Sequence, residues 1–345
     1  MAALSGVQTK RGELMTPKAR FTELLQDIEP SATTVSNAAS AHQALRDYLR
    51  NHETFKEKHV ETFLAGSYRR ATAIRPRTEN GVTARPDVDI FVVTSHTTDE
   101  SPESVLDTLE ATLKECYGEV KRQRRSLCVT TAGADMDVVP LVVAPFGGGF
   151  LIPDCDLKSW VATNPPQHTE WTTQVNERAG GRFKPLAKLM KWWRRLHPTT
   201  GKHPKGFVLE CVVAECMDFE EIHYGLLFVK TLEGIVSRYQ TWMAIDQVPT
   251  VFDPGVPGSS ITRDISYRDF RSFYDLVQKH AELARLALYE EDPEKMTDLW
   301  RKILGPRFPA AMAAKSEDLL QPAVPAPSLV FPDRPVKPNK PAGFA

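Results

Sequence analysis

The sequence has no long hydrophobic run and no excess of charge of one sign. No apolar stretch in its 345 residues approaches the ~18 residues of a membrane-spanning helix, so no membrane partner is expected. Lys and Arg number 43 against 44 Asp and Glu, which gives a net charge of −1. The composition therefore carries no nucleic-acid signature, and long DNA or RNA is not an expected substrate.

Two further absences concern location. The first residues lack the apolar segment of a signal peptide. The five cysteines are scattered, with no Cys-x-x-Cys pair and no metal-site spacing, and unpaired cysteines are typical of a reducing compartment. We therefore expect a cytoplasmic protein. The hydrophobic content of 41% is enough for one two-lobed unit or for two domains.

Three aspartates stand at the start of apolar runs. Asp87 and Asp89 precede IFVV, and Asp137 precedes VVPLVV. Side chains at i and i+2 of a strand point to the same face, so Asp87 and Asp89 project together, and a carboxylate from a neighbouring strand would complete a cluster. Such carboxylates repel one another unless a hard cation such as Mg²⁺ lies between them. Two ions ~3.5–4 Å apart can hold the attacking and leaving oxygens of an in-line phosphoryl transfer.

A small-residue turn, Gly66-Ser67, follows the apolar pair Phe63-Leu64. Its backbone N–H groups and hydroxyl suit a triphosphate. Taken alone, a Gly-Ser pair is an ordinary turn, and an Asp-x-Asp on a strand edge is most often solvated surface. The occurrence of Gly-Ser, Asp-x-Asp and Asp-Val-Val-Pro in this order favours a nucleotide and metal site over that simpler alternative.

In this order the motifs resemble those of the nucleotidyltransferase superfamily with a polymerase-β-like core. More closely, they are similar to the cGAS/DncV-like nucleotidyltransferases (CD-NTases) of bacterial antiphage (CBASS) systems and to the oligoadenylate synthases. The resemblance implies that Asp87, Asp89 and Asp137 hold two Mg²⁺ ions, with Mn²⁺ as a substitute, and that the Gly-Ser turn binds donor phosphates. Asp135 also belongs to an Asp-x-Asp, but the family's third acid directly precedes the apolar pair and proline, which selects Asp137.

Two helical stretches of the C-terminal half extend the resemblance. The segment LAKLMKWWRR resembles an oligoadenylate-synthase helix, which implies that Lys191 reaches nucleotide phosphates. The segment HPKGFVLECVVAECM resembles a helix with an aromatic residue followed three positions later by Glu. It implies that Phe207 stacks on a base and that Glu210 belongs to the nucleotide site. For Phe207 a core aromatic is the alternative.

Other features keep two interpretations. His168 is either catalytic or, as we favour, a hydrogen-bonded structural histidine, because phosphoryl transfer by two metals needs no histidine. The basic run from 121 to 125 is by default a solvated strand or hairpin, and otherwise a patch for phosphates or an RNA activator, whose binding would depend on salt.

The Gly-rich segment 145–153 lacks the Lys-Ser/Thr of a P-loop and is expected to be a hairpin. The polar segment 75–85 is expected to be a loop of unassigned role.

The expected fold class is α+β. It consists of a polymerase-β-like nucleotidyltransferase core, a mixed β-sheet with helices, plus a helical C-terminal lobe, with the nucleotide cleft between them. We assign residues 1–17 to a flexible N-terminus, 18–165 to the catalytic lobe with its N-terminal helices, 166–310 to the helical nucleotide-binding lobe, and 311–345 to a flexible Pro-rich tail.

The tail permits two interpretations. Its prolines favour an extended linker. In some CD-NTases, however, accessory proteins join a flexible C-terminus with a small last residue to a target, and by this resemblance Ala345 is a candidate conjugation site.

The resemblance implies that the protein uses ATP and other NTPs to make a cyclic di- or trinucleotide that signals to a downstream effector in antiphage defence. One alternative is a linear oligonucleotide synthase or an RNA nucleotidyltransferase. The near-neutral charge argues against long RNA as a substrate. Another is a nucleotide-binding regulatory pseudoenzyme, against which the complete set of three acids argues. Base identity, linkage and ring size do not follow from the sequence.

Overall fold

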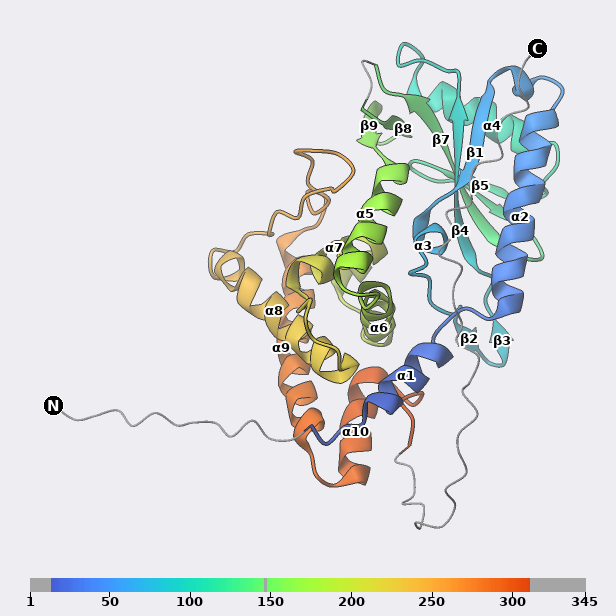
Figure 1. The fold of residues 1–345 in the computed structure, drawn as a ribbon. Coiled ribbons are helices and arrows are strands. Elements are labelled where there is room, and N and C mark those ends of the chain that lie inside the picture. Colours follow the sequence, from blue (N-terminus) through green and yellow to red (C-terminus); the bar gives the residue numbers. More distant parts are fainter. Residues whose placement is uncertain (1–13, 146–147, 311–345) are drawn as a thin grey trace. The chain divides into compact units, whose positions relative to one another are not determined.

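A seven-stranded mixed sheet carries the predicted acids (Figure 1). The computed structural model describes residues 14–145 and 148–310. Strands β4 and β7 run parallel at the centre of the sheet, and the other pairings are antiparallel. The order is β1 (His59–Leu64), β4 (Asp87–Thr94), β7 (Asp135–Val143), β6 (Leu127–Thr130) and β5 (Val120–Arg122), with β8 (Phe150–Asp154) paired to β7 and β9 (Ser159–Thr163) paired to β8.

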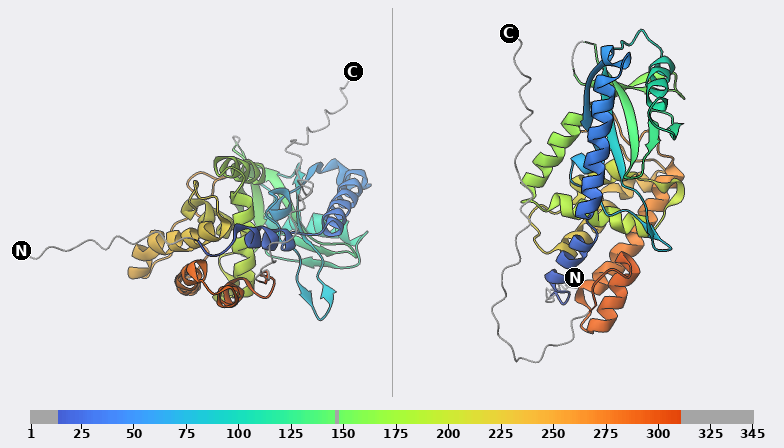
Figure 2. Two further views of the ribbon diagram at one scale, coloured as in Figure 1. Left: turned by 60° about the horizontal axis from the view of Figure 1, so that its bottom comes forward. Right: turned by 90° about the vertical axis from the view of Figure 1, so that its right-hand side faces the viewer.

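Two helices cover one face of this sheet. Helix α2 (Ala32–Asn51) and helix α4 (Pro102–Lys114) lie along the sheet (Figure 2). Their apolar side chains share one cluster with those of the strands. Val88 and Ile90 of β4 are fully buried in that cluster, and burial of such a side chain contributes about 1.5–3 kcal/mol. Because strand side chains alternate, the covered face takes Val88 and Ile90 and leaves Asp87 and Asp89 on the opposite face.

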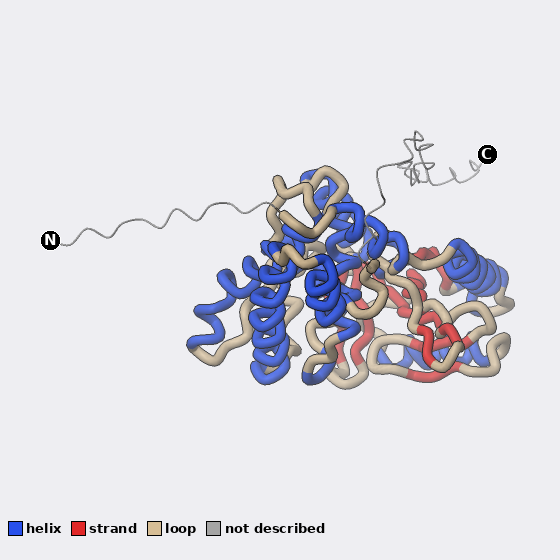
Figure 3. Tube along the Cα trace, turned by 90° about the horizontal axis from the view of Figure 1, so that it is seen from below, coloured by secondary structure: helices blue, strands red, loops and turns tan. Residues whose placement is uncertain are grey.

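A second lobe consists of helices around its own apolar core. Figure 3 shows most of the helices gathered on one side and the strands on the other. Ser266 and Asp292 cap the N-termini of the last two helices with their side chains, as is typical of N-cap residues. The lobe contains α5 (Pro165–Arg178), α6 (Phe183–Leu196), α7 (Gly206–Cys216), α8 (Tyr224–Ala244), α9 (Tyr267–Tyr289) and α10 (Pro293–Leu304). The predicted α+β class with a helical C-terminal lobe is confirmed.

The N-terminal segment differs from the sequence-based division. Helix α1 (Lys18–Asp27) was grouped with the catalytic lobe, but its apolar face packs in the core of the helical lobe, where the Phe21 ring lies 4.9 Å from that of Trp300. Thr16 was assigned to a flexible end, yet it is buried and donates a hydrogen bond to the Ala287 carbonyl. The apolar residues of α1 therefore contribute to the helical core, whereas one face of the sheet is covered by α2 and α4.

The segment 75–85 contains a small hairpin of β2 (Thr78–Glu79) and β3 (Val82–Thr83) rather than a plain loop. Residues 1–13 and the tail 311–345 lie outside the described residues, and so does the candidate conjugation site Ala345. Within the described ranges, no helix is both long and apolar enough to cross a membrane.

Candidate active site

The predicted Gly-Ser turn is the start of a one-turn helix, α3 (Gly66–Arg69), directly after β1. Gly66 has a φ of 61°, a left-handed conformation that glycine adopts most readily. A Cβ at this position would lie 1.6 Å from Oδ2 of Asp89. In addition, the Ala65 amide donates to the Asp89 carbonyl over 2.9 Å. Only glycine therefore lets the turn lie directly against the acid-bearing strand.

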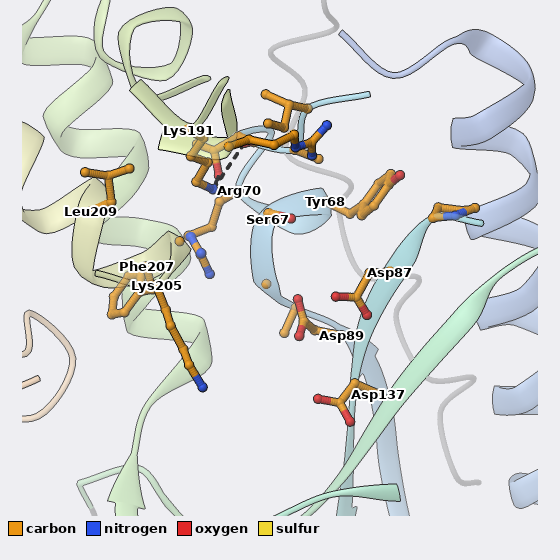
Figure 4. Close-up of a pocket in the computed structure, with 18 of the residues that line it drawn as sticks. Ser67, Tyr68, Arg70, Asp87, Asp89, Asp137, Lys191, Lys205, Phe207 and Leu209 are labelled. Carbon is orange, nitrogen blue, oxygen red and sulfur yellow. Dashed lines mark hydrogen bonds between the residues drawn. The ribbon is translucent and has the colours of Figure 1, made fainter. Parts of the chain in front are cut away.

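The parallel pairing of β4 and β7 brings the predicted acids together. Asp89 is in register with Asp137, and Asp87 is in register with Asp135. Figure 4 shows Asp87, Asp89 and Asp137 on one side of the cavity. Asp135 forms an ion pair with Arg85, whose Nε lies 2.9 Å from its Oδ1. In contrast, Oδ1 of Asp137 is buried and has no hydrogen-bond partner within residues 14–145 and 148–310.

The three carboxylates disfavour one another's charge. Burial raises the pKa of Asp137, and burial together with Asp137 and Asp135 raises the pKa of Asp87. Burial, Asp87 and Asp137 raise the pKa of Asp89 to about 6, although Arg70 and Lys191 act in the opposite direction. Repulsion of this kind between carboxylates is what a nearby cation relieves.

The donor chemistry of this cluster fits a hard divalent cation, which prefers oxygen ligands. In the part of the chain that the structure describes, no three His, Cys, Asp or Glu side chains are already arranged as a metal cluster. The fit therefore rests on the raised pKa values and the unpartnered oxygen of Asp137, not on a preformed coordination shell.

Across the cavity, a carboxylate is fully satisfied. Glu210 of α7 is 0% exposed, and its oxygens accept two hydrogen bonds of 3.0 Å from Arg70 and one of 2.9 Å from Thr72. The Lys191 ammonium donates to the same carboxylate. Burial alone would raise the pKa of Glu210, but Lys191 and Arg70 lower it to about 2.

This network changes the expected roles of two residues. Lys191 lines the cavity, but its ammonium is held by Glu210 and by Thr72, whose hydroxyl lies 3.1 Å away. Glu210 is not among the residues that line the cavity. In this conformation Glu210 positions Arg70 and Lys191 instead of facing a ligand.

Phe207 and His168 lie next to one another in the cavity wall. Their ring centroids are 4.5 Å apart, and the Arg70 guanidinium lies 4.8 Å from the centre of the Phe207 ring. His168 Nε2 lies 2.6 Å from Oδ1 of Asp253, so the favoured interpretation of a hydrogen-bonded histidine is confirmed. Phe207 is partly buried against the helical core and also faces the cavity, so it combines the two alternatives considered for it.

The basic run from 121 to 125 is largely neutralised. Arg122 pairs with Asp107 and Glu110. Arg124 and Arg125 share the buried carboxylate of Asp154, whose pKa falls to about 2 because their hydrogen bonds outweigh its burial. The run forms the hairpin β5–β6, as in the default interpretation.

The cavity has a volume of about 1050 Å³, at the upper end of small-molecule sites. Its charged lining is mostly basic although the whole chain has a net charge of −1. This excess favours a polyanionic ligand such as a nucleoside triphosphate. The charged lining residues are Arg70, Arg77, Arg85, Lys191, Arg194, Arg195, Lys202 and Lys205, with Asp87, Asp89 and Asp137 as the acids.

Sequence reasoning missed several of these residues. Arg70 stands in the sequence just after the Gly-Ser turn, but nothing in the chain order pairs it with a carboxylate 140 positions away. Arg194 and Arg195 were part of the quoted segment LAKLMKWWRR, and the helical spacing of four residues from Lys191 to Arg195 was the available signal.

Comparison with known proteins gives consistent matches. The family described as the Second Messenger Oligonucleotide or Dinucleotide Synthetase (SMODS) domain matches residues 15–176. A cyclic AMP-AMP-AMP synthase from an Acinetobacter species is 47% identical over 340 residues, which cover 96% of this chain and 98% of the relative. A cyclic AMP-AMP-GMP synthase from Enterobacter hormaechei is 28% identical, over 84% of this chain and 91% of the relative.

Solved structures share the fold at low identity. The CD-NTase CdnG of Bradyrhizobium diazoefficiens in complex with GTP has a TM-score of 0.71 at 19% identity, over 85% of this chain and 97% of that one. CdnC of E. coli with ATP has a TM-score of 0.67 at 19% identity, over 86% and 99%. The two-lobed arrangement described above is therefore similar to that of structures determined with nucleotides.

Proposed function

This chain belongs to the cGAS/DncV-like nucleotidyltransferase (CD-NTase) family, and from that membership we propose that it joins ATP into a cyclic trinucleotide, cyclic AMP-AMP-AMP. The chain is an enzyme, a nucleotidyltransferase that makes a cyclic oligonucleotide. The choice of adenine at every position rests on the Acinetobacter relative, and another NTP at one position, as in the Enterobacter relative's product, is the second candidate.

The observation that carries the proposal is that two walls of one cavity have lining side chains of opposite charge. Asp87, Asp89 and Asp137 line one side and form no ion pair with any residue that the structure describes, and an excess of basic side chains lines the rest. In the proposal, the three acids hold Mg²⁺ or Mn²⁺, which when bound neutralises their repulsion and polarises phosphate oxygens. Gly66 and Ser67 contact the donor phosphates.

The transfer step follows from these positions. A ribose hydroxyl oxygen of one nucleotide forms a bond to the α-phosphorus of another. The bond from that phosphorus to the bridging oxygen breaks, and its electron pair leaves with pyrophosphate. Asp137 accepts the hydroxyl proton, because its Oδ1 is buried and has no hydrogen-bond partner among the described residues, which leaves this oxygen available to a proton donor.

The proposal also includes the cellular role of the product, the accessory proteins and the location of the enzyme. The product signals to a downstream effector in antiphage defence, and accessory proteins of such a system act on the tail at Ala345. A cytoplasmic location fits a chain whose five cysteines are all free, because cytosolic thiols are kept reduced.

The test is product analysis. Incubate the full chain with each NTP and Mg²⁺, treat the product with phosphatase and measure its mass. We expect a phosphatase-resistant ring of three adenylates, absent with Asp87→Ala or Asp89→Ala. Asp275→Asn, an exposed carboxylate on α9 paired with Arg271, is the matched control with unchanged activity.

Other outcomes identify the alternatives. A phosphatase-sensitive product would indicate a linear synthase, and nucleotide binding without pyrophosphate release would indicate a regulatory pseudoenzyme. Full activity in both aspartate variants would contradict the assignment of the acids.

A further inference from the structure

One ring edge of His168, on α5, is closed by the loop that precedes α9. The Nε2 atom of His168 lies 2.6 Å from Oδ1 of Asp253. Gly255 packs against the same edge, and a Cβ at this position would lie 2.6 Å from Cδ2 and 2.7 Å from Nε2 of the imidazole. A residue without a Cβ is therefore what lets the loop backbone approach the ring so closely.

Asp253 determines which nitrogen of this ring carries the hydrogen. Its Oδ1 also accepts a hydrogen bond of 2.8 Å from the Gly255 amide. Burial alone would raise the pKa of Asp253, but the contact with His168 and the backbone amides of Gly255 and Val256 lower it. Because a carboxylate cannot donate, Nε2 of His168 carries the hydrogen of this contact. In the neutral ring, Nδ1 is then an acceptor.

Nδ1 is the nitrogen of His168 that is open to a ligand. Within residues 14–145 and 148–310 it has no hydrogen-bond partner, and it is not buried. The His168 side chain is 12% exposed, and it lines the cavity that the three acids also line. Since the loop closes the Nε2 edge, the ring presents one hydrogen-bond acceptor of fixed identity to a molecule in this part of the cavity.

Phe207 makes this acceptor relevant to a nucleobase. Its ring centroid lies 4.5 Å from that of His168, and Phe207 also lines the cavity. Figure 4 shows Phe207 across the cavity from Asp87, Asp89 and Asp137. A nucleotide whose α-phosphate lies at the acids can therefore place its base at the Phe207 side, where an aromatic surface favours the flat face of a base.

An acceptor at this place distinguishes the two purines. The 6-amino group of adenine donates hydrogen bonds, whereas O6 of guanine only accepts them. Nδ1 of His168 can pair with the amino group, but with guanine two acceptors would face one another and both would stay unpaired. A site built to pair with one polar group rejects an analogue that lacks it, because its own polar atom is left without a partner.

We propose that His168 selects adenine at one base position of the active site by accepting a hydrogen bond from the 6-amino group at Nδ1. Asp253 is a positioning residue that holds the imidazole in the required tautomer. The inference rests on the proposed function and deepens it, because it assigns a residue to the choice of base.

The test is a binding measurement on the full chain that needs no turnover. The probes are non-hydrolysable analogues of ATP and GTP and inorganic triphosphate, which has no base. At about pH 8, wild type should bind the ATP analogue about tenfold or more tightly than the GTP analogue. The amide of His168→Gln can keep the contact with Asp253 but offers no acceptor at the place of Nδ1, so the two analogues should bind within about threefold of one another. Triphosphate should bind equally to both proteins.

A change in the ligand sharpens the assignment to one atom. An ATP analogue without the 6-amino group should bind wild type about tenfold more weakly than the ATP analogue, but His168→Gln by less than about threefold, because the partner is already absent. A purely structural role of His168 predicts the same factor in both proteins.

Asp253 is tested by a pair of variants. Asp253→Ala removes control of the tautomer, so the preference for the ATP analogue should fall by about threefold or more. Asp253→Asn should restore this preference, because its amide oxygen can still accept from the Gly255 amide and from Nε2. Arg271→Gln changes an exposed side chain on α9 and is the control, with all affinities as in wild type.

The outcomes separate the two levels of the proposal. Equal binding of the two analogues to wild type, or an undiminished preference in His168→Gln, would overturn the role of His168 and leave the proposed function intact. A loss of triphosphate binding in His168→Gln equal to that of the ATP analogue would also overturn it. Failure of wild type to bind any nucleotide would overturn the proposed function as well.

Discussion

The three acids on the sheet and the buried carboxylate of Glu210 on the helical side are in opposite electrostatic states. On the sheet, burial and mutual repulsion raise the pKa of Asp89 to about 6. On the helical side, Lys191 and Arg70 overcome the burial of Glu210 and lower its pKa to about 2. The two groups are chemically alike, so the difference lies in their partners. The satisfied cluster holds the fold, and the unsatisfied cluster is left for a ligand that the chain does not supply.

The same comparison separates structural from functional charge elsewhere. Asp154 is buried like Glu210 and, like it, is paired with two cations, here Arg124 and Arg125. We expect substitutions in paired clusters to change stability, and substitutions in unpaired clusters to change activity.

The largest expected effect is on the acid cluster. Asp89→Asn should reduce product formation by about 10³-fold or more. The variant loses several kcal/mol of charge stabilisation in the transition state, and each 1.36 kcal/mol lowers the rate about tenfold. Its free energy of unfolding should be unchanged or higher, because a repelled charge is removed. Initial rates and urea denaturation measure the two quantities. A large loss of stability would show that the acids serve the fold.

The opposite pattern is expected at Glu210. Glu210→Gln leaves Arg70 and Lys191 buried without their carboxylate, and breaking a buried pair in this way costs about 3–5 kcal/mol. Urea denaturation measures the change, with Asp275→Asn as the control, for which an exposed pair predicts a loss below about 1 kcal/mol. Equal stability of Glu210→Gln and wild type would remove the distinction between the two clusters.

A buried histidine outside both clusters tests whether burial alone produces such effects. His280 accepts a hydrogen bond of 2.9 Å from Trp193 Nε1, and burial, His197 and Lys279 lower its pKa to about 4. Because protonation favours the unfolded chain, stability is present above the unfolded pKa of ~6.5 and is lost as the pH falls toward about 4.

At pH 5 the linked loss is ~2 kcal/mol. Urea denaturation at pH 7.5 and pH 5 measures it, and in His280→Gln this component of the pH dependence should disappear. The pH profile would contradict the assignment if the variant and wild type lost equal stability over this range.

The smallest effect is expected on the exposed hairpin. Arg122→Gln removes pairs with Asp107 and Glu110 that are partly exposed, so the stability loss should not exceed about 1 kcal/mol. Nucleotide affinity should not change, because Arg122 lies outside the cavity lining. Weakened, salt-dependent nucleotide binding would instead restore the interpretation of this run as a phosphate patch.

The sequence predicted the α+β class and the proximity of the acids well, because strand alternation and chain order carry that information. It could not predict that Glu210 faces Arg70 rather than a ligand, because that contact joins two lobes. It also did not predict that the apolar face of α1 packs in the core of the helical lobe, since an amphipathic helix shows that it has an apolar face but not which core receives it.

The central claim is that Asp87, Asp89 and Asp137 are an incomplete cluster that a divalent cation completes. The most direct measurement is the change in Tm on adding Mg²⁺ or Mn²⁺ at a saturating concentration of a non-hydrolysable ATP analogue. A ligand that binds only the folded state raises Tm, so we predict a rise of several degrees in wild type and little or none in Asp89→Asn. An equal rise in both proteins, or none in wild type, would contradict the account.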